Sequence, residues 1–121
     1  MAQYMLLINI PTAGSPTPEE GGPSTEDWFA YSQELEDAGV RVAGDALELV
    51  DSATTVRVRD GETLITDGPF AETKEVLGGY FIVDVPDLDA ALKWAAKMPN
   101  IAYGSVEVRP VMVYDQQPAG A

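Results

Sequence analysis

Two segments are apolar on both of their alternating sides, and they constrain the fold more than any other feature of the chain. In residues 3–10, one side carries Tyr4, Leu6, Ile8 and Ile10, and the other carries Met5, Leu7 and Asn9. Residues 76–85 have the same character. A strand that is apolar on both sides is covered on both sides. We therefore expect two central strands of one sheet, with helices over one face and a second copy of the chain, in a homodimer, over the other.

Two amphipathic helices are expected between the strands. Ser24 or Thr25 begins the first helix, since both are good N-caps, and Gly39 ends it. Its predicted buried stripe is Trp28, Tyr31, Leu35 and Ala38. Asp87 begins the second helix, whose predicted sheet-facing residues are Leu88, Ala91, Leu92 and Ala95.

The remaining strands are predicted at residues 40–49, 53–59, 62–66 and 105–114, with Gly44 marking a bulge or bend in the first of them. Asp60-Gly61 is a strong two-residue hairpin signal. The order β-α-β, hairpin, β-α-β predicts an α+β fold of the ferredoxin-like type, a split βαβ duplication with a hairpin insertion. We expect one domain over residues 1–115 and a disordered tail over 116–121. The long proline-rich loop from Pro11 to Pro23 is expected to be mobile or to lie over a pocket.

Composition excludes several classes of function. The 121 residues have a formal net charge of −13, which makes nucleic acid a poor partner. Histidine and cysteine are both absent, so zinc sites built from them, thiol nucleophiles and disulfides are excluded. We expect no metal and no cofactor. No apolar run approaches the ~20 residues of a membrane span, so no membrane partner and a cytoplasmic location are expected.

The segment Asp67-Gly68-Pro69-Phe70-Ala71-Glu72-Thr73-Lys74-Glu75 is dense in both chain-breaking and ionisable residues. A charged, sharply turned connection between strands suits a binding site, although an ordinary solvated loop has the same composition. Asp67 and Glu72 are the candidate catalytic carboxylates, and the alternative for Asp67 is a backbone-capping role in the turn. The candidate ligand contacts in and after this segment are Asp67, Gly68, Pro69, Phe70, Glu72, Lys74, Gly79 and Tyr80. For Gly79, with Gly78, the alternative is a bulge, and for Tyr80 it is a core position with a satisfied hydroxyl.

Few cations are present, and all four arginines, Arg41, Arg57, Arg59 and Arg109, fall on predicted strands. Arg57 and Arg109 are candidates for binding an anionic or carbonyl-bearing small molecule. The alternative is cross-strand pairing with acidic neighbours, which we favour for Arg59 near the hairpin tip. Asn9, a polar residue on an apolar strand, is a further candidate for lining a pocket, or else a hydrogen-bonded interface residue.

DGPFAETKE, followed by LGGYFIVDV and GSVEVRPV, resembles the DGPF family of YCII-related proteins, and the resemblance runs from Tyr4 to about Val111. It implies a ferredoxin-like fold paired into a dimeric α+β barrel, but no established reaction. Some YCII-related proteins carry a His–Asp pair proposed to act in acid–base chemistry. This chain has no histidine that could match, so catalysis by such a pair is in doubt here.

Three functions remain open from the sequence. The favoured one is a small-molecule-binding or accessory protein with a cavity at the dimeric sheet interface. The second is a cofactor-independent enzyme, of the isomerase or lyase type, acting on a small carbonyl compound or aromatic acid; this rests on fold analogy alone. The third, implied by the resemblance, is a regulatory partner linked to an extracytoplasmic sigma factor.

Overall fold

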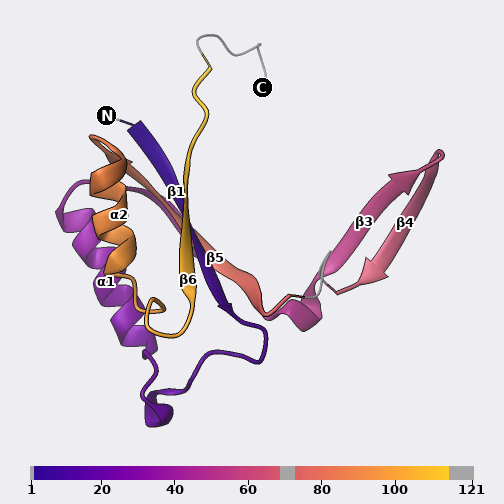
Figure 1. Ribbon diagram of the computed structural model, residues 1–121, viewed down its shortest axis with the longest axis horizontal. Coiled ribbons are helices and arrows are strands. Elements are labelled where there is room, and N and C mark those ends of the chain that lie inside the picture. The colour runs from indigo at the N-terminus through magenta and orange to yellow at the C-terminus, as the bar shows by residue number, and fades with distance from the viewer. Residues whose placement is uncertain (1, 69–72, 115–121) are drawn as a thin grey trace.

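A computed structural model describes residues 2–68 and 73–114 of the chain. The elements are β1 (Ala2–Pro11), η1 (Pro18–Glu20), α1 (Thr25–Asp37), β2 (Arg41–Ala46), η2 (Val50–Ser52), β3 (Thr54–Arg59), β4 (Glu62–Asp67), β5 (Glu75–Val85), α2 (Leu88–Ala96) and β6 (Ser105–Pro110). Four strands form an antiparallel sheet in the order β2-β5-β1-β6, and α1 and α2 lie side by side over one of its faces (Figure 1). This architecture confirms the predicted ferredoxin-like α+β fold.

The core lies between the sheet and the two helices. Alternation along β1 and β5 turns one set of apolar side chains toward the helices: Leu6, Ile8, Phe81, Val83 and Val85. From the other side, the helices and the turn after α2 contribute Tyr31, Leu35, Ala91, Ala95 and Met98. Each apolar side chain removed from water contributes roughly 1.5–3 kcal/mol, so this layer supplies most of the driving force for folding.

Several predicted details of the helices and strands are wrong. Ala38 is exposed because it is the C-cap of α1, beyond the last buried turn. Leu88 and Leu92 are 46% and 45% exposed, because the buried stripe of α2 runs instead through Ala91 and Ala95 to Met98. Strands β2 and β6 are also shorter than expected, since they end at Ala46 and Pro110.

Two irregularities set the register of the sheet. The β2–β5 pairing shifts between Arg41 and Ala43, and the β1–β5 pairing shifts between Ile8 and Asn9, opposite Gly78. Gly44 is needed beside the first shift, because a Cβ there would lie 2.5 Å from the Phe81 ring. The bulge at the glycine pair is thereby confirmed, whereas the irregularity predicted at Gly44 lies at Val42, between Arg41 and Ala43.

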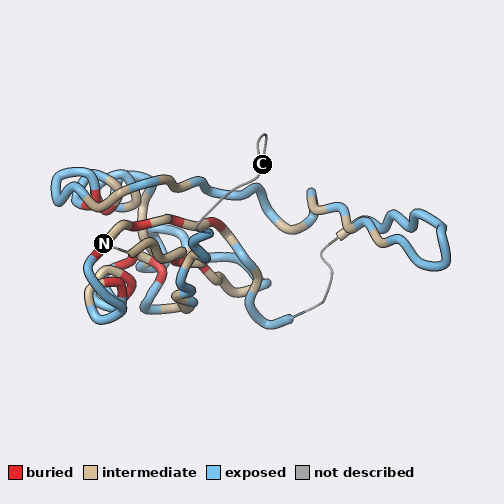
Figure 2. Tube along the Cα trace, turned by 90° about the horizontal axis from the view of Figure 1, so that it is seen from above, coloured by how far each residue is buried: buried red, intermediate tan, exposed pale blue. Residues whose placement is uncertain are grey.

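Strands β3 and β4 form a separate two-stranded sheet, which we call the arm (Thr54–Asp67). Asp60 and Gly61, with φ angles of 53° and 77°, make its tight turn, as the Asp-Gly signal predicts. Figure 1 shows the helices on one side of the large sheet and the arm standing away from the opposite side. Figure 2 shows that the arm is exposed over most of its length.

The loop after β1 lies against the helix side of the sheet. Its residues Ser15 and Pro23 join Trp28, Ile8 and Ile10 around a cavity of about 210 Å³, so the loop forms part of the wall of a pocket. Within the described ranges, no helix has the length and apolar character needed to cross a membrane.

Candidate functional site

The sheet face without helices has an apolar centre. The pairing places Met5 and Leu7 of β1 beside Ile82 and Tyr80 of β5 on this face, and all four are half-buried although neither helix covers them. Polar residues of the four strands surround this centre: Asn9, Asp45, Asp84, Ser105, Glu107 and Arg109. An apolar patch with a few polar groups around it has the composition of a ligand site or a protein interface.

A tyrosine and a carboxylate form the most defined polar contact on this face. Asp45 of β2 lies opposite Tyr80 of β5, and the Tyr80 hydroxyl donates a 2.8 Å hydrogen bond to Asp45 Oδ2. This hydrogen bond to the carboxylate, reinforced by its negative charge, raises the pKa of Tyr80. Tyr80 therefore stays protonated at neutral pH. The pair can accept hydrogen bonds from a ligand, but it holds no phenolate that could act as a base.

Arg109 supplies the positive charge on the same face. Its Nε lies 3.6 Å from Glu107 Oε2, and its side chain is 71% exposed. Such a long, solvated ion pair contributes little to stability. The guanidinium can therefore turn toward an anionic or carbonyl oxygen at low cost.

Asp84 is the fourth charged group of this face. It pairs in register with Gln3 of β1, and its Oδ1 is buried without a hydrogen-bond partner among the residues that the structure describes. Buried polar atoms in native proteins are almost always hydrogen-bonded. Asp84 Oδ1 is therefore an exception among the buried polar atoms, and it is closed to solvent in the described chain.

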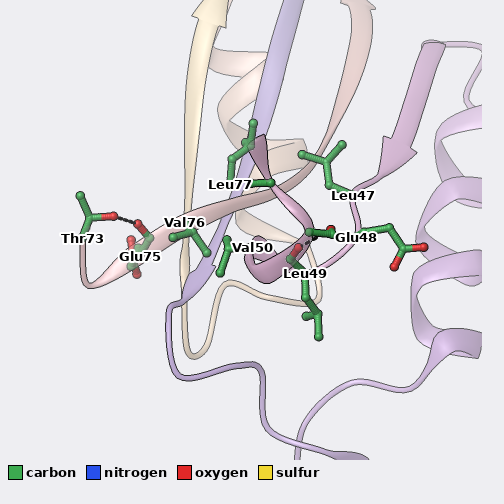
Figure 3. A pocket seen from close by; sticks show the side chains of 10 residues that line it. Leu47, Glu48, Leu49, Val50, Thr73, Glu75, Val76 and Leu77 are labelled. Atoms are coloured by element: carbon green, nitrogen blue, oxygen red, sulfur yellow. Dashed lines mark hydrogen bonds between the residues drawn. The ribbon is translucent and has the colours of Figure 1, made fainter. Parts of the chain in front are cut away.

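A second feature is a hollow of about 520 Å³ at the base of the arm (Figure 3). It lies between the connection from β2 to β3 and the start of β5, and its apolar lining is Leu47, Leu49, Val50, Ala53, Val76 and Leu77. At its rim the Thr73 hydroxyl donates to the carbonyl of Glu75, and the Ser105 hydroxyl donates to the Glu75 carboxylate at 2.6 Å. Thr73 and Glu75, at the end of the segment from Asp67 to Glu75, thus border a hollow large enough for a small ligand.

The structure brings three of the sequence-predicted residues to one face. Asn9, Tyr80 and Arg109 all lie on the helix-free side of the sheet. Gly79 is buried on the other side, where a Cβ would lie 2.7 Å from the carbonyl oxygen of Asp45, so the β2 backbone occupies the space beside it. Arg57 lies on the arm, half-buried.

The other candidates lie at the base of the arm. Asp67 is exposed at the end of β4, and Gly68, with φ 99°, donates its N–H to the carbonyl of Ala53 at 2.7 Å. Lys74 is exposed, and its carbonyl accepts the N–H of Thr12 at 2.9 Å. Pro69, Phe70 and Glu72 lie outside the described residues, as do the predicted tail residues.

Sequence reasoning missed Asp45 and the apolar lining of the hollow. No local signal could have found Asp45, because its contact with Tyr80 depends on the register shift within β2. The sequence predicts that Leu47 and Leu49 continue the strand, but β2 ends at Ala46 and both leucines line the hollow instead. Across residues 2–68 and 73–114, no three acidic side chains gather as a metal site.

Comparison with known proteins gives the family. The family model of the YCII-related domain matches residues 2–115. An uncharacterized protein of Rhizobium meliloti (strain 1021) is 39% identical over 98 residues, which cover 79% of each chain. On these two matches, the chain belongs to the family of YCII-related proteins.

Proposed function

We propose that the chain acts as a homodimer, in which a second copy covers the helix-free sheet face, and that it binds a small molecule between the two sheets. The observation that carries this proposal is the apolar centre of Met5, Leu7 and Ile82 on a face that neither helix covers. Two sheets that pack face to face lie about 10 Å apart, with the side chains of both inner faces between them, so a ligand bound there would contact the residues of this face directly.

The polar groups on this face indicate the class of ligand. Arg109 suits a carboxylate or carbonyl oxygen, and the Tyr80–Asp45 pair accepts a hydroxyl or amide donor. The apolar centre suits an aliphatic or aromatic body. The ligand is therefore a small carbonyl compound or carboxylic acid with an apolar group.

Thermal unfolding with two probes tests this ligand class. Benzoate has an aromatic body and a carboxylate, and benzyl alcohol has the same body without the charge. A ligand that binds only the folded chain raises Tm, so we expect benzoate to raise the Tm of the wild-type protein more than benzyl alcohol does. Arg109→Ala should abolish that difference.

A matched pair of tyrosine variants completes the experiment. Tyr80→Phe removes the hydroxyl on the helix-free face, whereas Tyr4→Phe removes one from the helix side of β1. Benzyl alcohol offers a donor to the Tyr80–Asp45 pair, so its effect should change in Tyr80→Phe, where the Asp45 carboxylate is left without the tyrosine hydroxyl, and should stay the same in Tyr4→Phe. Equal shifts in wild type and in all three variants would contradict the proposed site.

A further inference from the structure

The arm exposes an apolar surface that the described chain leaves uncovered. In its register Val56 lies opposite Ile65 and Val58 lies opposite Thr63, so the two valines and the isoleucine share one face. Val56 and Val58 are each 59% exposed, and Ile65 is 67% exposed. Leu64, on the other face opposite Arg57, is 44% exposed.

Such an element is a poor structure on its own. An isolated two-stranded hairpin is at best marginally stable in water, and a third strand or a packed surface is needed to hold it. Both strands of the arm are also edge strands, since β3 pairs only with β4 within the described sheets. Exposed edges beside apolar side chains favour association with another surface.

We propose that the arm packs its apolar face, Val56, Val58 and Ile65, against a second copy of the chain. This inference rests on the dimer of the proposed function, and it adds that the arm contacts the partner subunit. The arm stands on the side of the sheet that faces away from the helices (Figure 1), so a second copy seated on the helix-free face meets it.

The dimensions agree with this arrangement. Strands of six residues extend about 20 Å, whereas packed sheets are separated by about 10 Å. The arm is therefore long enough to reach past the sheet of the partner. Because the interface of a two-fold dimer is self-complementary, each arm would hold the other subunit.

The distribution of charge on the arm agrees with a packed interface. Arg57 and Arg59 alternate with Val56 and Val58 along β3, so both arginines lie on the opposite face of the arm. The apolar face therefore meets the partner without a charged side chain of β3, and the cores of protein interfaces are depleted of charge in the same way.

Sedimentation equilibrium on two arm variants tests the proposal. The double variant Val56→Lys/Ile65→Lys places two charges on the apolar face, and Leu64→Lys is the matched control on the opposite face. Because burying unpaired charge is costly, we expect the double variant to weaken the dimer by about a hundredfold. The control should change the dimer Kd by less than about threefold.

The outcomes separate the arm from the dimer. If the wild-type protein sediments as a monomer, both the proposed dimer and the packing of the arm on the partner are overturned. If the wild-type protein is a dimer and the double variant has the same dimer Kd, the dimer stands and only the packing of the arm on the partner is overturned.

A measurement on the wild-type chain guards against misfolded variants. Amide hydrogen exchange of residues 54–67 is followed well above and well below the dimer Kd. Slower exchange in the dimer supports packing of the arm on the partner. Equal exchange at both concentrations, in a protein that dimerises, overturns it.

Discussion

Two tyrosines of this chain do different work because their hydroxyls lie in different surroundings. The Tyr31 hydroxyl is buried between the helices and donates a 2.7 Å hydrogen bond to the carbonyl of Trp94. Its ring meets those of Phe81 and Trp94 edge to face, at centroid distances of 5.5 Å and 6.3 Å. The Tyr80 hydroxyl instead bonds a carboxylate on the helix-free face. The first tyrosine holds the core together, and the second belongs to the candidate site.

Tyr31 is expected to make stability fall at high pH. Burial, with the nearby charge of Glu34, raises the pKa of Tyr31 in the folded chain. In the unfolded chain the Tyr31 hydroxyl has a pKa of about 10 and loses its proton above that pH, whereas in the folded chain it stays protonated. The resulting contribution to stability is complete below that pH and declines as the pH rises above it.

Urea unfolding of wild type and Tyr31→Phe checks this dependence. At neutral pH the variant should be less stable by about 1–3 kcal/mol, because the buried Trp94 carbonyl loses its donor. Above about pH 10 the difference should shrink. A difference that stays constant across this range would contradict the assigned role.

Asn100 is the second residue whose surroundings dictate a measurable effect. It is fully buried, and its Nδ2 donates to the carbonyls of Asn9 at 3.1 Å and Ser105 at 3.0 Å. It thereby fastens the turn before β6 to strand β1. Asn100→Ala should cost about 2–4 kcal/mol in the free energy of unfolding, since two buried carbonyls lose their donor.

Gln33→Ala is the matched control for Asn100, because it removes an exposed amide that bonds Asp37 at 2.9 Å. Its effect should stay within about 0.5 kcal/mol. If chemical unfolding shows the same loss of unfolding free energy for both variants, the buried hydrogen bonds of Asn100 contribute no more to stability than an exposed one.

At the scale of elements, α1 owes its start to a reciprocal cap. The Ser24 hydroxyl accepts the N–H of Asp27 at 3.2 Å, and the Ser24 N–H donates to the Asp27 carboxylate at 2.8 Å. These hydrogen bonds satisfy two backbone N–H groups, those of Ser24 and Asp27, that the start of the helix would otherwise leave without an acceptor. Because Tyr31 and Leu35 lie on this helix, the cap also positions half of the core.

Removing the cap should destabilise the protein without changing its fold. We expect Ser24→Ala to lower the free energy of unfolding by about 1 kcal/mol. Thr25→Ala, one residue on and inside the helix, should have little effect, since Ala is the better helix former. Thermal unfolding of the two variants, side by side, distinguishes a cap at Ser24 from one at Thr25.

Element order could be predicted from the sequence, whereas the contacts between elements could not. The Asp60-Gly61 turn and the doubly apolar segments are local signals, and they placed the hairpin and the two central strands. The contact of Tyr80 with Asp45 depends on a one-residue slip in β2, which reverses the side of every later residue. The hollow unites residues 47–53 with 73–77, which are brought together by folding rather than by sequence.

Over residues 2–68 and 73–114, the molecule is a two-layer body with one sheet face that neither helix covers and a projecting arm (Figures 1 and 2). Both features leave apolar side chains without cover from the described chain: Met5 and Leu7 on the face, Val56 and Ile65 on the arm. A second copy seated on the helix-free face would cover both at once, which is the reason for assigning the two surfaces to one dimer.

A lysine on the helix-free face should dissociate this dimer. Leu7→Lys places a charge at the centre of the proposed interface, and we expect a dimer Kd at least about a hundredfold higher. Leu92→Lys, on a leucine of α2 that is 45% exposed, is the control and should leave the Kd unchanged. Size-exclusion chromatography with light scattering reads out both variants.

The most direct test is sedimentation equilibrium of the unmodified protein. The chain has a mass of 13.0 kDa, and the proposed assembly predicts a species of twice that mass that dissociates on dilution. A single species of 13.0 kDa at every concentration would leave Met5, Leu7 and Ile82 facing water and would contradict the proposed dimer and the ligand site within it.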